Sequence, residues 1–107
     1  MITRQSLATI DADPRRFRPN LIVDVPDSDD PFPENGWVGQ TIEIGDAQIR
    51  IDTECPRCVM ITRPFADLPE DRSVLRRVVR DANQNLGVYA TVTRAGDVRV
   101  GDEVRVV

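Results

Sequence analysis

The feature that most constrains the fold is a pair of alternating segments joined by Gly45-Asp46. Thr41–Ile44 and residues 47–52 each carry an apolar side chain at every second position. Alternation with a period of two is typical of a strand with one buried face, and a glycine-containing pair between two such segments is typical of a tight hairpin turn. We therefore predict a β-hairpin over residues 41–53.

Further extended segments lie on both sides of this hairpin. Residues 21–25 are rich in β-branched side chains and predict a buried strand. The segment 37–40 predicts the beginning of another short strand. Near the C-terminus, Gly-Asp turns separate further predicted strands at residues 88–93, 98–100 and 103–107.

One main helix is predicted at about residues 68–84. Asp67-Leu68-Pro69-Glu70 resembles a capping box, with an acid at the N-cap, proline in the first turn and glutamate three residues later. The apolar positions that follow are spaced for one helical face: Val74, Leu75, Val78, Val79 and Ala82. The other face is expected to be solvated and carries Arg72, Arg76, Arg77, Arg80 and Asp81. A second, short helix or turn is predicted at residues 3–10, with Thr3 as its N-cap.

These elements predict an α+β fold, a mixed and mostly antiparallel β-barrel-like domain with one main helix. With 107 residues, the chain is expected to form a single domain over residues 1–107. The segment 26–36 is rich in proline and acidic residues and predicts a surface loop.

Charge and hydropathy exclude several classes of protein. The net charge of −4 argues against a nucleic-acid-binding surface. No apolar run approaches the roughly 20 residues that span a bilayer, and the first residues lack the pattern of a signal peptide. We therefore expect a cytoplasmic protein that binds neither nucleic acid nor membrane.

Histidine and lysine are both missing, so all 14 basic residues are arginine. The missing histidine removes a Cys/His nucleophile pair, a histidine general base and most zinc sites. Arginine remains as the binder of phosphate or carboxylate, through its bidentate fork.

The two cysteines are the residues most suggestive of chemistry. Cys55-Pro56-Arg57-Cys58 follows the hairpin and precedes the β-branched segment 59–62, which we expect to resume extended structure. The pair is thus predicted to lie on a short kink between two strands.

The spacing of the pair leaves several roles open. A zinc site needs four ligands, so it would require a dimer that shares four cysteines. A thioredoxin-type site needs a helix after the first cysteine, and a structural disulfide fits poorly with an intracellular chain. The remaining roles are two core cysteines, or one thiolate that ligates a soft metal or a metal cofactor, with Arg57 favouring the charged form.

Three motifs in this order resemble the MOSC domain, a family that takes its name from the C-terminal part of molybdenum cofactor sulfurase. The resemblance covers about residues 3–107 and also extends to the mitochondrial amidoxime-reducing component and its bacterial relatives. Its motifs are Arg16-Phe17-Arg18-Pro19-Asn20 with the following Leu21-Ile22-Val23, then Cys55-Pro56-Arg57-Cys58, then Leu86-Gly87-Val88-Tyr89-Ala90 with Gly96 to Val104.

The resemblance implies a mixed β-barrel that binds the molybdenum–pterin cofactor (molybdopterin). By motif position, Cys58 is expected to be the protein ligand to molybdenum, and Arg18 and Asn20 to lie near the cofactor, with Arg57 beside them. A thiolate is a soft ligand that suits such a metal, and arginine suits the pterin phosphate. Cys55 is expected to pack or to support the site. If the chain is active, the resemblance implies reduction of N-oxygenated compounds or handling of cofactor sulfur.

The resemblance is limited to the C-terminal part of the family's architecture. We therefore expect a homodimer, or a redox or cofactor-delivery partner. The alternative is a cofactor-free structural or protein-interaction domain in which Cys55 and Cys58 are core residues. A ligand Cys58 is expected to face a pocket that Arg18 and Asn20 also line. A pyridoxal phosphate aldimine is excluded, because the chain has no lysine.

Overall fold

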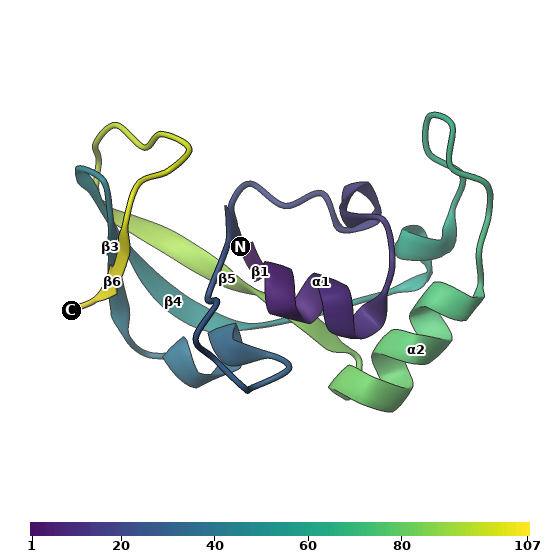
Figure 1. Ribbon diagram of the computed structural model, residues 1–107. Helices are drawn as coiled ribbons and strands as arrows, with labels where there is room; N and C mark the ends of the chain where they lie inside the picture. The colour runs from purple at the N-terminus through teal and green to yellow at the C-terminus, as the bar shows by residue number, and fades with distance from the viewer.

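The hairpin forms the centre of the fold in the computed structural model, which describes residues 1–107 (Figure 1). Strand β3 (Thr41–Ile44) pairs antiparallel with β4 (Ala47–Pro56), and Ile42 lies opposite Ile49. Gly45 makes the turn with a φ of 54°, a left-handed conformation that glycine adopts without strain. The predicted hairpin is confirmed, and its second strand continues past residue 53 to Pro56.

The hairpin is extended into a four-stranded sheet with the order β5-β4-β3-β6. Strand β5 (Asn85–Arg94) pairs antiparallel with β4, and β6 (Val104–Val106) pairs antiparallel with β3. The α+β class and the antiparallel sheet are confirmed. The sheet does not close into a barrel, because β5 and β6 are its two edges and do not pair with each other.

A second, small sheet pairs β1 (Ile2–Thr3) in parallel with β2 (Ile22–Val23). The predicted buried strand at residues 21–25 is therefore shorter than expected, and Ile22 is 42% exposed. Helix α1 (Arg4–Ile10) follows β1 directly, and the Thr3 side chain accepts a hydrogen bond from Ser6 N–H. The predicted helix at residues 3–10 and its cap are confirmed.

The main helix, α2, covers Ser73–Ala82 and is shorter than the predicted 68–84. Phe65 and Leu68 exchange two backbone hydrogen bonds of 2.8 and 3.1 Å, which close a tight turn where the helix was expected to begin. The predicted capping box is therefore wrong, and the Asp71 carboxylate instead accepts from Ser73 N–H at 3.0 Å. The buried face is also narrower than predicted, since Val79 is 50% exposed.

Three further segments differ from the predicted strands. Residues 59–62 form the 3-10 helix η3 (Val59–Thr62), in which the Thr62 hydroxyl donates to the Val59 carbonyl at 2.6 Å. Residues 98–100 form no strand, because the loop that contains them lies against the hairpin turn, where Asp46 N–H donates to Asp97 O at 3.1 Å. Trp37, at the start of the segment 37–40, ends the 3-10 helix η2 (Pro33–Trp37).

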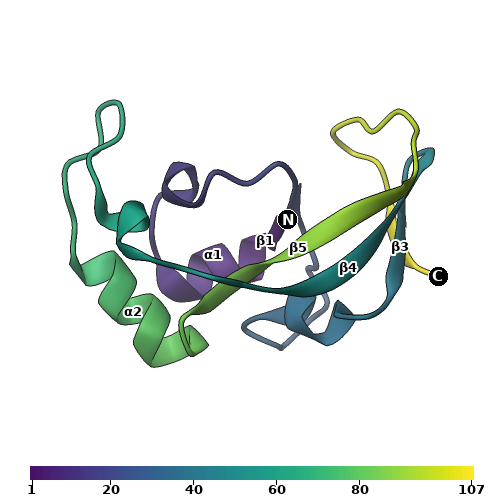
Figure 2. The same cartoon turned by 180° about the vertical axis from the view of Figure 1, so that it is seen from behind.

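The core consists of two clusters at opposite ends of one long ribbon. Strands β4 and β5 form this ribbon, which runs from the helical end of the molecule to the end formed by β3 and β6 (Figures 1 and 2). One cluster lies between α1, α2 and η3, and the other lies on the inner face of the sheet. Neither α-helix has the length and apolar character that crossing a bilayer requires.

Candidate functional site

The two cysteines lie in opposite environments, although only two residues separate them. Cys55 is buried near the end of β4, whereas Cys58 is exposed at the N-cap of η3. Both are free thiols. The strand ends at Pro56, and Arg57 N–H then donates to Gln84 O at 2.8 Å, so the chain turns between the two thiols. The alternative in which both cysteines are core residues is thus wrong for Cys58.

Arg57 joins the cysteine segment, residues 55–58, to the motif at residues 16–20. Its guanidinium donates from Nε to Leu86 O at 2.9 Å and from Nη1 to Phe17 O at 3.2 Å. Its Cζ also lies 5.4 Å from the centre of the Phe17 ring. At Gly87, which has a φ of 77°, a Cβ would come within 2.9 Å of Met1 O and 3.3 Å of Arg57 Nη2, so glycine lets β5 pass close to the backbone of Met1 and beside Arg57.

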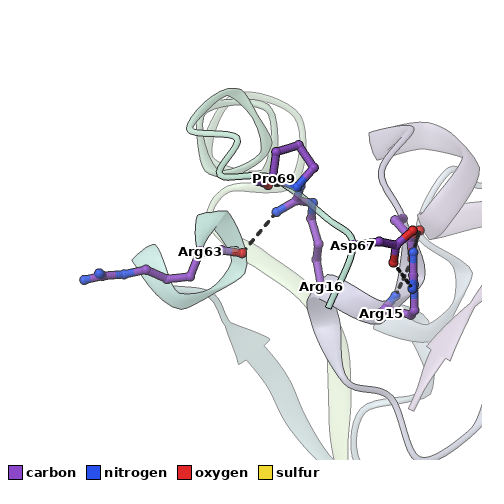
Figure 3. A network of polar contacts seen from close by, with 6 residues as sticks. Arg15, Arg16, Arg63, Asp67 and Pro69 are labelled. Atoms are coloured by element: carbon purple, nitrogen blue, oxygen red, sulfur yellow. Dashed lines mark hydrogen bonds and ion pairs between the residues drawn. The ribbon is translucent and has the colours of Figure 1, made fainter. Parts of the chain in front are cut away.

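Arg16 makes a second connection between distant segments, as Figure 3 shows. It lies in the 3-10 helix η1 (Pro14–Phe17) and donates to Ile61 O and Arg63 O at 3.4 Å each, and to Pro69 O at 2.6 Å. Three carbonyl groups around η3 and the following loop are therefore bonded to one guanidinium. Arg57 and Arg16 together fix η1, and the Arg18 that follows it, against the cysteine segment.

An ion pair beside this network adds to the same connection. Arg15 binds Asp13 on its own turn at 2.9 Å and reaches Asp67 at 2.7 Å (Figure 3). Hydrogen bonds from Arg15 hold the pKa of both carboxyl groups below their usual value of 3.8. Because these groups are exposed, the pair contributes little to stability compared with the part-buried carbonyl contacts of Arg57.

A small cavity of about 160 Å³ opens between these segments. Its polar lining side chains are Arg18, Asn20, Arg57, Cys55 and Tyr89. The structure thus brings together the three residues expected to bind cofactor. Cys58 does not line this cavity; the thiol that does so is Cys55.

Two of the cavity residues have side chains that are free to bind a ligand. Arg18 adopts a left-handed conformation with a φ of 47° at the end of η1, and its Cζ lies 5.4 Å from the centre of the Phe65 ring. Neither Arg18 nor Asn20 makes a side-chain hydrogen bond or an ion pair, and both are exposed. Arg57 differs from them, because its guanidinium is already bonded to two carbonyl groups.

Tyr89 is the lining residue to which the sequence gave no role. The neighbouring Cys55 thiol raises the pKa of the Tyr89 phenol above its usual value of 10.0. Tyr89 belongs to the motif Leu86-Gly87-Val88-Tyr89-Ala90, which the sequence analysis identified. The sequence did not indicate that this motif lies beside Cys55.

The protein alone offers few ligands for a metal. No group of three or more Cys, Asp or Glu side chains is placed to hold an ion. A single exposed thiol is nevertheless a suitable donor for a soft metal that arrives with most of its ligands already in place. The donor set of this chain therefore fits a metal cofactor better than a bare ion.

Comparison with family models shows which family the chain resembles. A family model described as the MOSC domain matches residues 2–105 of the 107-residue chain. A search among curated proteins finds no match.

Proposed function

This chain belongs to the MOSC domain family, whose domain is of the molybdenum cofactor sulfurase C-terminal type. On this premise, we propose that the chain binds the molybdenum–pterin cofactor beside Cys58. The observation that carries the proposal is the hydrogen bond from Arg57 to Phe17 O, which joins the cysteine segment to the segment of Arg18 and Asn20. This bond supports the proposal because it holds the segment that carries Cys58 against the segment that carries Arg18 and Asn20.

Each residue has a distinct role in this proposal. The Cys58 thiolate is the protein ligand to molybdenum, since it is exposed and soft thiolate suits such metals. Arg18 binds the phosphate of the pterin through its fork of N–H donors, and Asn20 adds an amide beside it. Arg57 positions both segments through its two carbonyl contacts and also lines the cavity.

The size of the cavity limits what it holds. Pockets that enclose small ligands usually measure about 300–1,000 Å³. The cavity at Arg18 and Asn20 measures about 160 Å³, which gives room for a phosphate group and not for a whole pterin. We therefore assign the phosphate to this cavity and the remainder of the cofactor to the exposed surface.

When bound, the cofactor supplies the redox chemistry by which N-oxygenated compounds are reduced. The chain's own residues would hold and orient the group, and the exposed position of Cys58 leaves the site open to water and to a partner. A homodimer, or a redox or cofactor-delivery protein, would cover this surface. Strands β5 and β6 are the edges of the sheet, and although Met1 bonds to Val88 on β5, the rest of these edges supports such an association, because unpaired strand edges readily accept another chain.

A second candidate is a cofactor-free structural or interaction domain. One observation favours it: the thiol that lines the cavity with Arg18 and Asn20 is Cys55, and Cys58 does not line it. In this case the cavity would be a packing feature of the fold, and Cys58 would be a surface residue.

Metal content distinguishes the two candidates. The chain would be produced in a host that makes the cofactor, and molybdenum would be measured by elemental analysis together with pterin fluorescence. The proposal expects near-stoichiometric metal in the wild type, loss of metal in Cys58→Ser and reduced pterin in Arg18→Gln. Cys55→Ser is the matched control and should retain the metal. No metal in the wild type, or equal metal in both serine variants, would favour the cofactor-free domain.

A further inference from the structure

A second and larger cavity lies between α2 and η3. It measures about 600 Å³ and is bordered by four arginines, Arg63, Arg72, Arg76 and Arg80, with Glu70 as the one acidic residue. We call it the arginine groove. None of the residues assigned to the cofactor lines this groove, although Val59, which does, directly follows Cys58.

The groove concentrates positive charge in a chain with a net charge of −4. Arg72 is paired with Glu70 at 3.5 Å, and Arg80 with Asp81 at 2.8 Å. Arg63 and Arg76 have no ion pair and no side-chain hydrogen bond. Figure 3 shows the Arg63 side chain extending away from the network in which its own carbonyl is bonded to Arg16. Two guanidinium groups at the groove are thus available to an anion.

The stability of α2 does not explain this arrangement. Arg72, Arg76 and Arg80 follow one another at intervals of four residues, and like charges at that spacing destabilise a helix. Arg72 also lies at the N-cap of α2, where the helix dipole favours a negative charge. Arg80 lies in the last turn, where the dipole favours a positive charge, so the unfavourable features are the spacing of the arginines and the position of Arg72. An anion between the arginines would offset both.

The floor of the groove is apolar. It is formed by Val59, Leu75 and Val79, of which Val59 and Val79 are each 50% exposed. A volume of about 600 Å³ lies in the range of about 300–1,000 Å³ that is usual for small-molecule pockets. An apolar floor with charged groups at the border suits a ligand that has an apolar body and an anionic group.

We propose that the arginine groove binds a small organic anion with a flat apolar body and two negative charges, the chemistry of an aromatic phosphate. The guanidinium groups of Arg63 and Arg76 bind the phosphate oxygens, and the apolar body covers Val59 and Val79. This inference goes beyond the proposed cofactor function and does not depend on Cys58.

Three probes separate the contributions of charge and apolar contact. They are 1-naphthyl phosphate, inorganic phosphate and 1-naphthol, each titrated into the full chain and followed by calorimetry and by amide chemical shifts. We expect 1-naphthyl phosphate to bind at least tenfold more tightly than either of the others. Its affinity should fall as salt is added, because salt screens the guanidinium charges.

Matched variants place the binding in the groove. Arg76→Gln should weaken binding of 1-naphthyl phosphate about tenfold, whereas Arg99→Gln, an exposed arginine outside the groove, should leave it unchanged. Val79→Ser should weaken 1-naphthyl phosphate and leave inorganic phosphate unaffected. Cys58→Ser and Arg18→Gln should bind it as the wild type does, so that loss of the cofactor function and loss of the groove are distinguishable.

Several outcomes would overturn the proposal. One is equal affinity of Arg76→Gln and Arg99→Gln for 1-naphthyl phosphate. Another is the absence of binding at millimolar concentration in folded protein. A third is tighter binding of an acidic peptide than of the aromatic phosphate, which would make the groove a surface for a protein partner.

Discussion

Arg57 Nη1 lies 3.2 Å from the carbonyl oxygen of Phe17, which is 40 residues away in the sequence. This contact joins the cysteine segment to the segment that carries Arg18 and Asn20. Together with the bond to Leu86 O at 2.9 Å, it makes Arg57 a structural connection between three parts of the chain. Arg57, which the motif predicts to bind the cofactor, therefore has two of its donors already bonded to the protein.

Replacing Arg57 should destabilise the fold. Arg57→Gln loses two hydrogen bonds to half-buried carbonyl groups and the contact with the Phe17 ring, so we expect a loss of about 2–3 kcal/mol in the free energy of unfolding. Urea denaturation measures this loss. Arg99→Gln is the control and should change stability by less than about 0.5 kcal/mol, as is usual for an exposed residue. Equal stability of the two variants would show that the Arg57 contacts are unimportant.

Glu34 should be among the most sensitive positions of the fold. Its side chain has an exposed fraction of 0% and accepts from Thr3 N–H at 2.7 Å, from the Thr3 hydroxyl at 3.1 Å and from the Ser6 hydroxyl. Glu34→Ala leaves these donors without an acceptor, and we expect a loss of about 3 kcal/mol or more.

Thermal unfolding of Glu34→Ala would be compared with that of Glu103→Ala, whose glutamate is exposed. A small and equal change in both variants would contradict the structure. Glu34→Gln should fall between them, because its amide oxygen still accepts while its NH₂ group faces other donors.

The two thiols should differ in reactivity. Cys58 is exposed and should react quickly with Ellman's reagent, whereas Cys55, which is 7% exposed, should react only slowly unless denaturant is added. Cys58→Ser should therefore remove the fast phase and Cys55→Ser the slow one. Equal rates for both thiols, or no free thiol before reduction, would be inconsistent with this structure.

The single tyrosine allows a direct titration. The neighbouring Cys55 thiol raises the pKa of Tyr89 above 10.0, so the absorbance of tyrosinate at about 295 nm should develop at a higher pH than in a model peptide. Cys55→Ala should return the pKa toward 10.0. A lower titration midpoint for Tyr89 in the wild type than in Cys55→Ala would exclude the interaction of Tyr89 with Cys55.

The sign of the linked stability follows from the direction of this shift. A phenol whose pKa is raised by folding stabilises the fold fully at pH values below 10.0, its value in the unfolded chain. The contribution is lost as the pH rises through the higher pKa of the folded state. The difference in stability between wild type and Cys55→Ala should therefore change only in the alkaline range, and a change near neutral pH would not arise from Tyr89.

Local patterns predicted the elements whose stability is local. The hairpin at Gly45-Asp46 and the short helix capped by Thr3 both depend on residues close in sequence, and both are confirmed. The expected cap at Asp67 was wrong because Phe65 and Leu68 form a turn that competes with the first turn of the helix. Likewise, β-branched residues at 59–62 fold into η3, since a local preference for strand does not supply a pairing partner.

The arrangement of the candidate site illustrates the same limit. The motifs named Arg18, Asn20 and Arg57 as cofactor residues, and these three do line one cavity. The sequence did not indicate that Cys55 would line this cavity and that Cys58 would not. It also gave no sign that Arg63 and Arg76 would border a separate groove, because these residues come from different elements.

The sequence by itself determined the membership of a family, the hairpin at the centre of the sheet and the absence of histidine and lysine from any site. Only the tertiary structure decided which arginines are bonded and which are free. Arg16 and Arg57 donate to carbonyl groups more than 25 residues away, whereas the side chains of Arg18 and Arg76 make no hydrogen bond and no ion pair. The physical reason is that a guanidinium makes the same bonds to any suitable acceptor, so its role depends on which carbonyl groups the folded chain brings within reach.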